Sequence, residues 1–325
     1  MRALAKALLL SLVFVGCGAP SGAGTTVGPN ADANAATARP PLHGTFTYVK
    51  DGVSTYVSSG WGFSTASYVI EGPTGLVVID TEFLPSAAEE LVNDAESATH
   101  KQVLLAIVLH PNPDKFNGTD VMRKHGAKVV TSEEVLAKIP AVFAQRTRAF
   151  RSRYAPDWPE ATPLPDSFGA ADTDLSAGGV TVRAHVLGAG CSEAHVVVEW
   201  SHEIFPGDLV ANRSHSWLEL GLTPEWLKRL DEMRAMHPTK VHPGRGPSGG
   251  PELLDAETKY LNDAILAVAH EQPTPKVDDA GIARAKKTLT DEYPGYDFDM
   301  FLDIGLPAEW ARQAKTAPFP VDVKP

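Results

Sequence analysis

The stretch "LHPNPDKFNG", residues 109–118, lies at the junction of two patterns that together decide the fold. The apolar run "QVLLAIVL" (102–109) before it is typical of a buried strand. The polar segment "GTDVMRKHG" (118–126) after it is compatible with a helix. Many α/β proteins place their chemistry at such a strand end, so the loop is a candidate functional site.

The loop carries a mixed set of side chains. His110 and Asp114 keep the spacing expected of metal ligands. Asn112 and Lys115 stand where two further imidazoles would be useful to a metal ion. The loop therefore resembles a metal site in which half of the ligands have been replaced.

Composition indicates an ordinary globular protein with an acidic surface. The chain has 325 residues, of which 43% are hydrophobic and 21% charged, enough for one large core or two modest domains. The formal net charge is −11 at pH 7. Because nucleic-acid binding depends on positive charge, we expect no nucleic acid among its partners.

The N-terminal segment has the pattern of an export signal. The first 17 residues, "MRALAKALLLSLVFVGC", combine a basic start with an apolar run at 7–15 that is too short to span a bilayer. The end of this segment, "FVGC", resembles the lipobox of bacterial lipoproteins, which implies a lipoprotein-type signal peptide over 1–17 and acylation of Cys17. Since Gly18 follows and not an aspartate, the resemblance implies export to the cell envelope and an outer-membrane address facing the periplasm.

Residues 18–42 predict a flexible tether. The segment is rich in Gly, Ala and Pro with almost no large apolar side chain, so it cannot bury enough surface to fold. A globular domain is expected to begin near His43, and the membrane is then a partner through the lipid anchor. Apart from Cys17 the chain contains only Cys191, which has no second thiol for an internal disulfide and is by default buried and inert.

The rest of the chain predicts two similar halves, each with strands first and helices last. A break is expected at Pro140 in the helical region 132–155, the most basic part of the chain, and 278–299 is expected to be mainly a solvated helix followed by a loop. The expected strands are 44–49, 64–72, 75–81, 102–109, 127–132, 180–188, 195–200, 203–208 and 239–244, and the expected helices include 85–98, 223–237 and 250–272.

Five segments, in order, resemble motifs of the metallo-β-lactamase superfamily. They are "VVIDT" (77–81), "HPNPDK" (110–115), "LGAGCSEAHVVVEW" (187–200), "FPGDLV" (205–210) and "HPGRGP" (242–247). The resemblance implies an α+β fold, the four-layer αββα sandwich, over a domain at 43–272, followed by a C-terminal helical extension at 273–325. It also implies that Asp80 supports the site from a strand end.

The resemblance assigns two sets of ligand positions for zinc. In members with two zinc ions, one site uses the positions of His110, Asn112, Cys191 and Asp208, and the other uses those of Asp114, Lys115, Asp208 and Arg245. A lysine or arginine offers only donors and cannot bind zinc, but its charge can pair with a buried carboxylate. His110, Cys191 and Asp208 remain competent ligands for one zinc ion, with Asn112 a poor fourth that holds a water. The sequence thus allows one zinc ion or none.

Two functions remain open. The first is a hydrolase of an ester, lactone or amide with at most one metal ion, in which Asp114, Lys115 and Cys191 are catalytic and Asp80, Asn112 and Arg245 support them. Cys191 acts as a nucleophile there only if Lys115 or Arg245 lowers its pKa. The second is a pseudo-enzyme in which Lys115 and Arg245 replace zinc and the pocket binds a small molecule or a cell-envelope partner.

Several other residues near the matched segments have simpler explanations. A lone histidine such as His195, His215 or His242 is more often hydrogen-bonded than a ligand. Trp217 is expected near the pocket mouth, where it either grips an apolar substrate or packs against a helix.

Overall fold

The computed structural model describes residues 43–316. The expected signal peptide, Cys17 and the expected tether lie outside these residues, as do positions 317–325. Within the part that is described, no helix combines the length and apolarity needed to cross a membrane.

The first sheet has seven strands in the order β1-β2-β3-β4-β5-β6-β7. Neighbours from β1 to β4 are antiparallel, and neighbours from β4 to β7 are parallel. The strands are β1 (Thr45–Thr47), β2 (Val53–Val57), β3 (Ala66–Glu71), β4 (Leu76–Ile79), β5 (Val103–Ile107), β6 (Lys128–Thr131) and β7 (Asp166–Ser167).

The second sheet has five strands in the order β12-β11-β10-β9-β8. All neighbours are antiparallel except β11 and β12, which run parallel. The strands are β8 (Thr173–Ala177), β9 (Val180–Leu187), β10 (His195–Trp200), β11 (Glu203–Ala211) and β12 (Lys240–Arg245).

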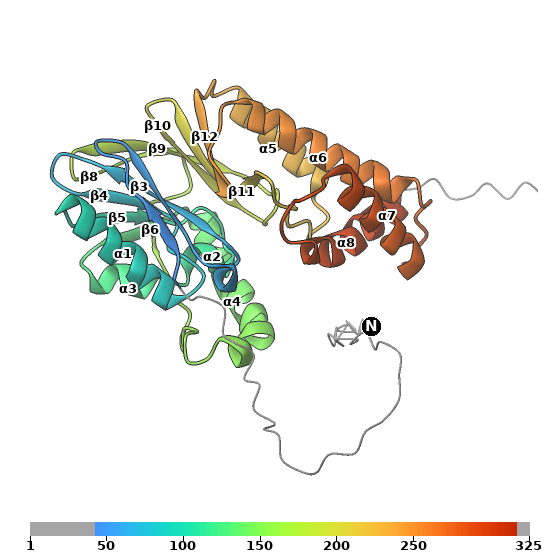
Figure 1. The fold of residues 1–325 in the computed structure, drawn as a ribbon, viewed down its shortest axis with the longest axis horizontal. Coiled ribbons are helices and arrows are strands. Elements are labelled where there is room, and N and C mark those ends of the chain that lie inside the picture. The colour runs from blue at the N-terminus through green and yellow to red at the C-terminus, as the bar shows by residue number, and fades with distance from the viewer. Residues whose placement is uncertain (1–42, 317–325) are drawn as a thin grey trace, which may run out of the picture. The chain divides into compact units, whose positions relative to one another are not determined.

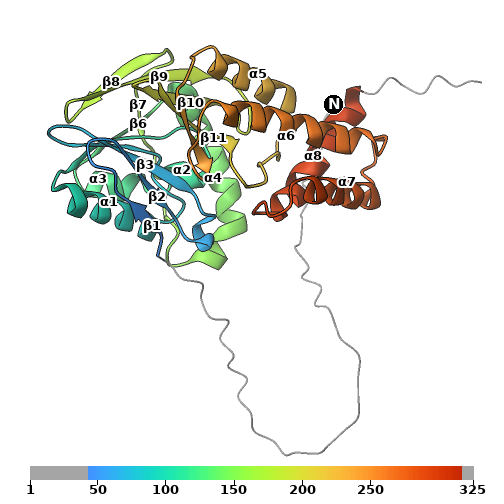
Figure 2. The same ribbon diagram turned by 45° about the horizontal axis from the view of Figure 1, so that its top comes forward.

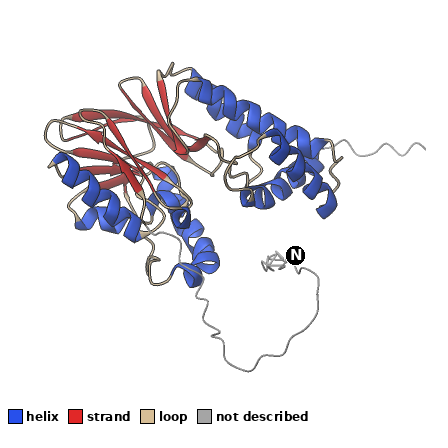
Figure 3. Ribbon diagram, viewed as in Figure 1, coloured by secondary structure: helices blue, strands red, loops and turns tan. Residues whose placement is uncertain are grey.

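The two sheets pack face to face with helices outside, in the αββα arrangement predicted from the sequence (Figures 1 and 3). On the first sheet lie α1 (Pro85–Thr99), α2 (Pro113–Phe116), α3 (Thr119–Lys124) and α4 (Glu133–Tyr154), and on the second lie α5 (Thr223–Arg234) and α6 (Glu252–Ala269). Strands such as β4 and β5 are apolar along their whole length because both faces of the sheet are covered. Between the sheets the Tyr68 ring meets the Phe205 ring edge-on at 5.4 Å, and the Tyr68 hydroxyl donates to the Pro243 carbonyl at 2.7 Å.

Helix α4 does not break at Pro140, so that prediction was wrong. The helix runs continuously over Glu133–Tyr154 with Pro140 inside it, and the Ser132 side chain caps its first turn by accepting from Val135 N at 3.2 Å. A proline removes one helical hydrogen bond, and the buried contacts of Ile139 and Phe143 on either side hold the helix against the core.

The C-terminal segment forms α7 (Asp279–Glu292) and α8 (Met300–Thr316), which pack beside α6 (Figure 2). The helix and following loop expected over 278–299 are present, and most of α7 is exposed, but Ala285 and Leu289 on one face are buried in the same apolar cluster as α5 and α6. Trp310 of α8 joins that cluster with only 2% of its surface exposed. Helices α7 and α8 therefore belong to the same apolar core as α5 and α6.

Candidate functional site

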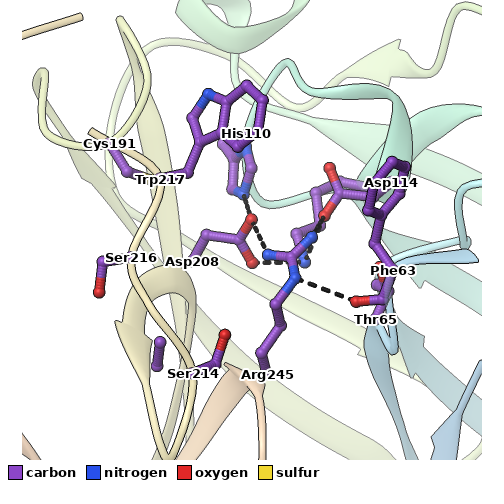
Figure 4. A network of polar contacts seen from close by, with 12 residues as sticks. Phe63, Thr65, His110, Asp114, Cys191, Asp208, Ser214, Ser216, Trp217 and Arg245 are labelled. Atoms are coloured by element: carbon purple, nitrogen blue, oxygen red, sulfur yellow. Dashed lines mark hydrogen bonds and ion pairs between the residues drawn. The ribbon is translucent and has the colours of Figure 1, made fainter. Parts of the chain in front are cut away.

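Residues of the five matched segments meet at one site, and Figure 4 labels members of four of these segments. Asp80 follows β4, and the loop with His110, Asp114 and Lys115 follows β5. The loop is held across the sheets because Val196 N donates to the Leu109 carbonyl at 2.7 Å. Parallel strands end at the same edge, which explains why residues far apart in sequence meet here.

Lys115 lies at the centre of this cluster. Its side chain is 0% exposed, and Nζ lies 2.8 Å from Asp208 Oδ1, 3.2 Å from Asp114 Oδ2 and 3.8 Å from Asp80 Oδ2. These contacts are ion pairs without aligned hydrogen bonds. Burial by itself lowers the pKa of Lys115, but the charges of Asp114 and Asp208, more than that of Asp80, outweigh it and hold that pKa above its usual value. The side chain is therefore a permanent positive charge.

Arg245 bridges the two carboxylates on the pocket side. Nη1 donates to Asp208 Oδ2 at 2.5 Å and Nη2 donates to Asp114 Oδ2 at 2.8 Å, while Nε donates to the Phe63 carbonyl at 3.2 Å. A planar guanidinium suits two carboxylates at once because its donors point in fixed directions.

Asp208 thus has both carboxylate oxygens occupied by cations. Burial raises the pKa of this carboxyl, but the charges of Arg245 and Lys115 outweigh it and hold the pKa well below its usual value. The Asp208 carboxylate can lie this close to the backbone only because residue 244 is a glycine: a Cβ built there would lie 2.1 Å from Asp208 Oδ1. The ion pairs expected from the sequence between two cations and two carboxylates are present.

His110 lies against this cluster as a neutral ring. Its Nε2 is 3.6 Å from Asp208 Oδ2 and has no hydrogen-bond partner among the described residues, and Nδ1 lies 3.3 Å from Ser192 Oγ. Burial lowers the pKa of His110 to about 3, so at neutral pH the imidazole is uncharged and only one of its two nitrogens carries a proton.

Cys191 is hydrogen-bonded to a histidine that the sequence did not single out as its partner. His195 Nε2 accepts from the Ser192 backbone N–H at 3.2 Å and lies 3.1 Å from Cys191 Sγ, while Nδ1 faces the Gly188 carbonyl at 3.0 Å. This pattern assigns the ring proton to Nδ1 and makes the thiol a donor. Burial raises the pKa of Cys191, whereas a nucleophilic thiol would need a lowered pKa.

Two buried acids lie behind Lys115. Asp80 takes a left-handed backbone conformation (φ 65°), and its Oδ1 accepts from Leu109 N at 2.9 Å. Burial raises the pKa of Asp80 to about 8, against the opposing charge of Lys115. Burial likewise raises the pKa of Glu82 to about 8, and Ser67 Oγ donates to its carboxyl at 2.7 Å. Glu82 was not predicted from the sequence, although its position two residues after Asp80, at a strand end, indicates a place in the site.

A pocket opens over Arg245 and is walled by aromatic rings. Its cavity volume is about 40 Å³. Its lining consists of Phe63, Phe83, Asn112, Pro113, Asp114, Arg146, Phe150, Asp208, Trp217, Arg245 and Phe301. Trp217 is at the pocket, as expected, but the four phenylalanines and Arg146 were not foreseen. Phe301 comes from α8, so the C-terminal extension completes the pocket.

A second hollow adjoins the first and shares Asn112 and Arg146 with it. Its cavity volume is about 90 Å³, and Cys191 is among the residues that line it. Arg146 forms a two-pronged ion pair with Glu219, and the indole N–H of Trp217 donates to the same carboxylate at 3.0 Å. This ion pair contributes to the wall between the two hollows.

The side chains present do not fit the zinc sites that the motifs imply. Two positions of one set hold Lys115 and Arg245, and the shared Asp208 is already bound by both. Across residues 43–316 the structure brings together no group of three or more His, Cys, Asp or Glu side chains that could hold a metal ion. The expected ligands His110, Cys191 and Asp208 are therefore neighbours that do not form a ligand set.

Comparison with known proteins agrees with this architecture. The model of the metallo-beta-lactamase superfamily matches residues 60–245, and the chain belongs to that superfamily. Among solved structures, a metallo-beta-lactamase from Pontibacter korlensis is similar at 21% identity and a TM-score of 0.52, covering 68% of this chain and 99% of its own. The metallo-beta-lactamase FIM-1 from Pseudomonas aeruginosa, in its mono-zinc form, is similar at 15% identity and a TM-score of 0.51, covering 68% of this chain and 96% of its own. The family and the αββα fold predicted from the five motifs are confirmed.

Proposed function

We propose that the protein is a non-catalytic member of the superfamily that binds a small molecule, with Lys115 and Arg245 in the place of zinc. One observation carries the proposal: both oxygens of Asp208 and one oxygen of Asp114 are engaged by these two cations. The cluster has matched charges, so the carboxylates are stabilised without a metal ion.

The remaining groups lack the features of a hydrolytic site. Hydrolysis of an ester, lactone or amide needs an activated nucleophile and a group that stabilises the developing negative charge. The Cys191 thiol donates to His195 Nε2, but burial raises the pKa of the thiol and lowers that of His195 to about 3, so this pair does not favour the reactive thiolate. The donors of Arg245 are directed at carboxylates and a backbone carbonyl, which leaves little of the guanidinium to meet a substrate oxyanion.

The pocket favours a ligand with an apolar or aromatic body. Five rings line it, and aromatic walls bind flat or apolar groups through buried area. Beneath them the charges of Lys115 and Arg245 balance those of Asp114 and Asp208. Because these charges cancel, they do not require a charged group in the ligand.

A metal-independent hydrolase is the second candidate, and His110 is the observation in its favour. Its Nε2 lies 3.6 Å from Asp208 Oδ2 and has no hydrogen-bond partner among the described residues, as a general base requires, although burial lowers the pKa of His110 to about 3 and makes it a weak base. Two measurements on the full chain separate the candidates: binding of 1-naphthol followed by tryptophan fluorescence, and turnover of nitrocefin, p-nitrophenyl acetate and γ-butyrolactone with and without added zinc. We expect saturable binding and no turnover. Turnover that His110→Asn abolishes would overturn the proposal.

The cellular place of the protein is also a proposal, supported by the sequence alone. The lipobox-like segment and the tether composition support export, acylation of Cys17 and an outer-membrane anchor facing the periplasm. The acidic net charge of −11 supports the absence of a nucleic-acid partner.

A further inference from the structure

The second half of α4 forms a basic side beside the pocket. From residue 141 to 156 the chain has four arginines and neither aspartate nor glutamate, although the formal net charge of the protein is −11. Arg146 pairs with Glu219. No carboxylate of the described residues pairs with Arg148, Arg151 or Arg153, so this segment keeps an uncompensated positive charge.

Helical geometry directs two of the four arginines to the pocket side. At about 100° per residue, Arg146, Phe150 and Arg153 share an arc of about 60°, whereas Arg148 lies on the opposite side. Arg146 and Phe150 do line the pocket. The Arg153 guanidinium lies over the Trp61 ring, 4.8 Å from its centroid.

Arg153 lies outside the pocket lining, about 4.5 Å further along α4 than the pocket residue Phe150. Its guanidinium also lies 5.6 Å from the centroid of the Tyr154 ring, and the Tyr154 ring meets the pocket ring of Phe83 edge-on at 5.0 Å. A molecule whose apolar part lies beside Phe150, and whose other end leaves the pocket along α4, therefore reaches Arg153.

We propose that the pocket takes a small anionic amphiphile, with its apolar chain among the aromatic rings and its anionic head outside them, on the side of α4 that carries Arg146 and Arg153. The inference rests on the proposed ligand-binding function and names the class of ligand. Arg146 uses Nη1 and Nη2 for Glu219, which leaves its Nε–H for an incoming anion. Because no carboxylate among residues 43–316 pairs with Arg153, its N–H donors remain for charge-assisted hydrogen bonds with a ligand.

The same structure argues against a cationic ligand. The guanidinium of Arg245 already covers the Phe301 ring, and that of Arg146 covers the Trp217 ring, each 5.4 Å from the ring centroid. A quaternary ammonium binds through such ring faces, so it would compete with two built-in cations.

Three probes of equal chain length test the inference with the full chain: octanoate, 1-octanol and octyltrimethylammonium, measured by isothermal titration calorimetry. We expect octanoate to bind about tenfold more tightly than either of the others, because one charge-assisted hydrogen bond to its carboxylate contributes about that factor in affinity. Arg153→Met should weaken octanoate binding about tenfold and leave 1-octanol unchanged. Arg148→Met is the matched control, because it removes the same charge from the opposite side of α4.

The outcomes separate this inference from the proposed function. Equal affinities for octanoate and 1-octanol, both lost in Phe301→Ala, overturn the anionic head and leave the apolar pocket standing. An equal loss in Arg148→Met and Arg153→Met assigns the effect to general surface charge and also overturns it. If none of the probes binds while the near-UV circular dichroism is native, both the inference and the proposed ligand-binding function fail.

Discussion

Replacing Lys115 by methionine removes the central charge of the ion-pair cluster while keeping most of the side-chain volume. Lys115 Nζ is fully buried and lies 2.8 Å from Asp208 Oδ1 and 3.2 Å from Asp114 Oδ2. Removing one partner of a buried pair costs about 3–5 kcal/mol, because the other charge stays buried. Since Arg245 still pairs with both carboxylates, we expect the lower end, a loss of about 3 kcal/mol in the free energy of unfolding.

Urea unfolding followed by tryptophan fluorescence measures this loss. Lys287→Met is the matched control, because Lys287 is 74% exposed and pairs with Asp291 on the surface of α7, where an ion pair contributes about 0–1 kcal/mol. The loss in Lys115→Met should shrink as the pH falls. Without the ammonium group a carboxyl in the cluster has a raised pKa, so the folded state takes up a proton that neutralises the uncompensated charge.

A loss in Lys115→Met no larger than that in the control would refute the reasoning, since the ammonium would then contribute nothing to the cluster. A large loss that does not change on acidification would assign the effect to packing and not to charge.

Three further outcomes follow from the buried groups and the N-terminus. Because the pKa values of Asp80 and Glu82 are raised to about 8, the folded state keeps two protons that the unfolded state has released, and the free energy of unfolding should fall as the pH rises towards about 8. Urea unfolding at a series of pH values should show a weaker pH dependence in the double variant Asp80→Asn/Glu82→Gln. Cys191 should react with Ellman's reagent only after unfolding, and rapid reaction of the native protein would contradict its burial and raised pKa. Cys17→Ser should release the protein from membranes or leave it unprocessed, and a wild-type protein that fractionates as soluble without an acyl chain would refute the anchor.

Much of the fold could be predicted because its signals are local. The continuous apolar runs of β4 and β5 mark strands covered on both faces, and the order of the five motifs identifies the sandwich. The ion pairs of Lys115 and Arg245 could be foreseen as well, because cations at ligand positions have few partners other than the carboxylates left beside them.

The pocket could not be predicted because its walls are assembled by tertiary packing. Phe63 follows a 3-10 turn, Phe150 lies on α4 and Phe301 on α8, and no spacing in the sequence links them. The bond between Cys191 and His195 depends on a loop conformation between β9 and β10, although the separation of four residues was visible. Helix α4 passes Pro140 because buried contacts on both sides outweigh one lost hydrogen bond.

The central claim, that Lys115 and Arg245 occupy the place of zinc, is tested most directly by the zinc dependence of the melting temperature. The double variant Lys115→His/Arg245→His restores two imidazoles beside Asp114 and Asp208, a combination that binds zinc. We expect the melting temperature of this variant to rise with added zinc and that of the wild-type protein to stay constant, because only the variant gains a ligand-dependent stabilisation. A zinc-dependent rise in the wild-type protein, with about one zinc ion per chain by elemental analysis, would contradict the account.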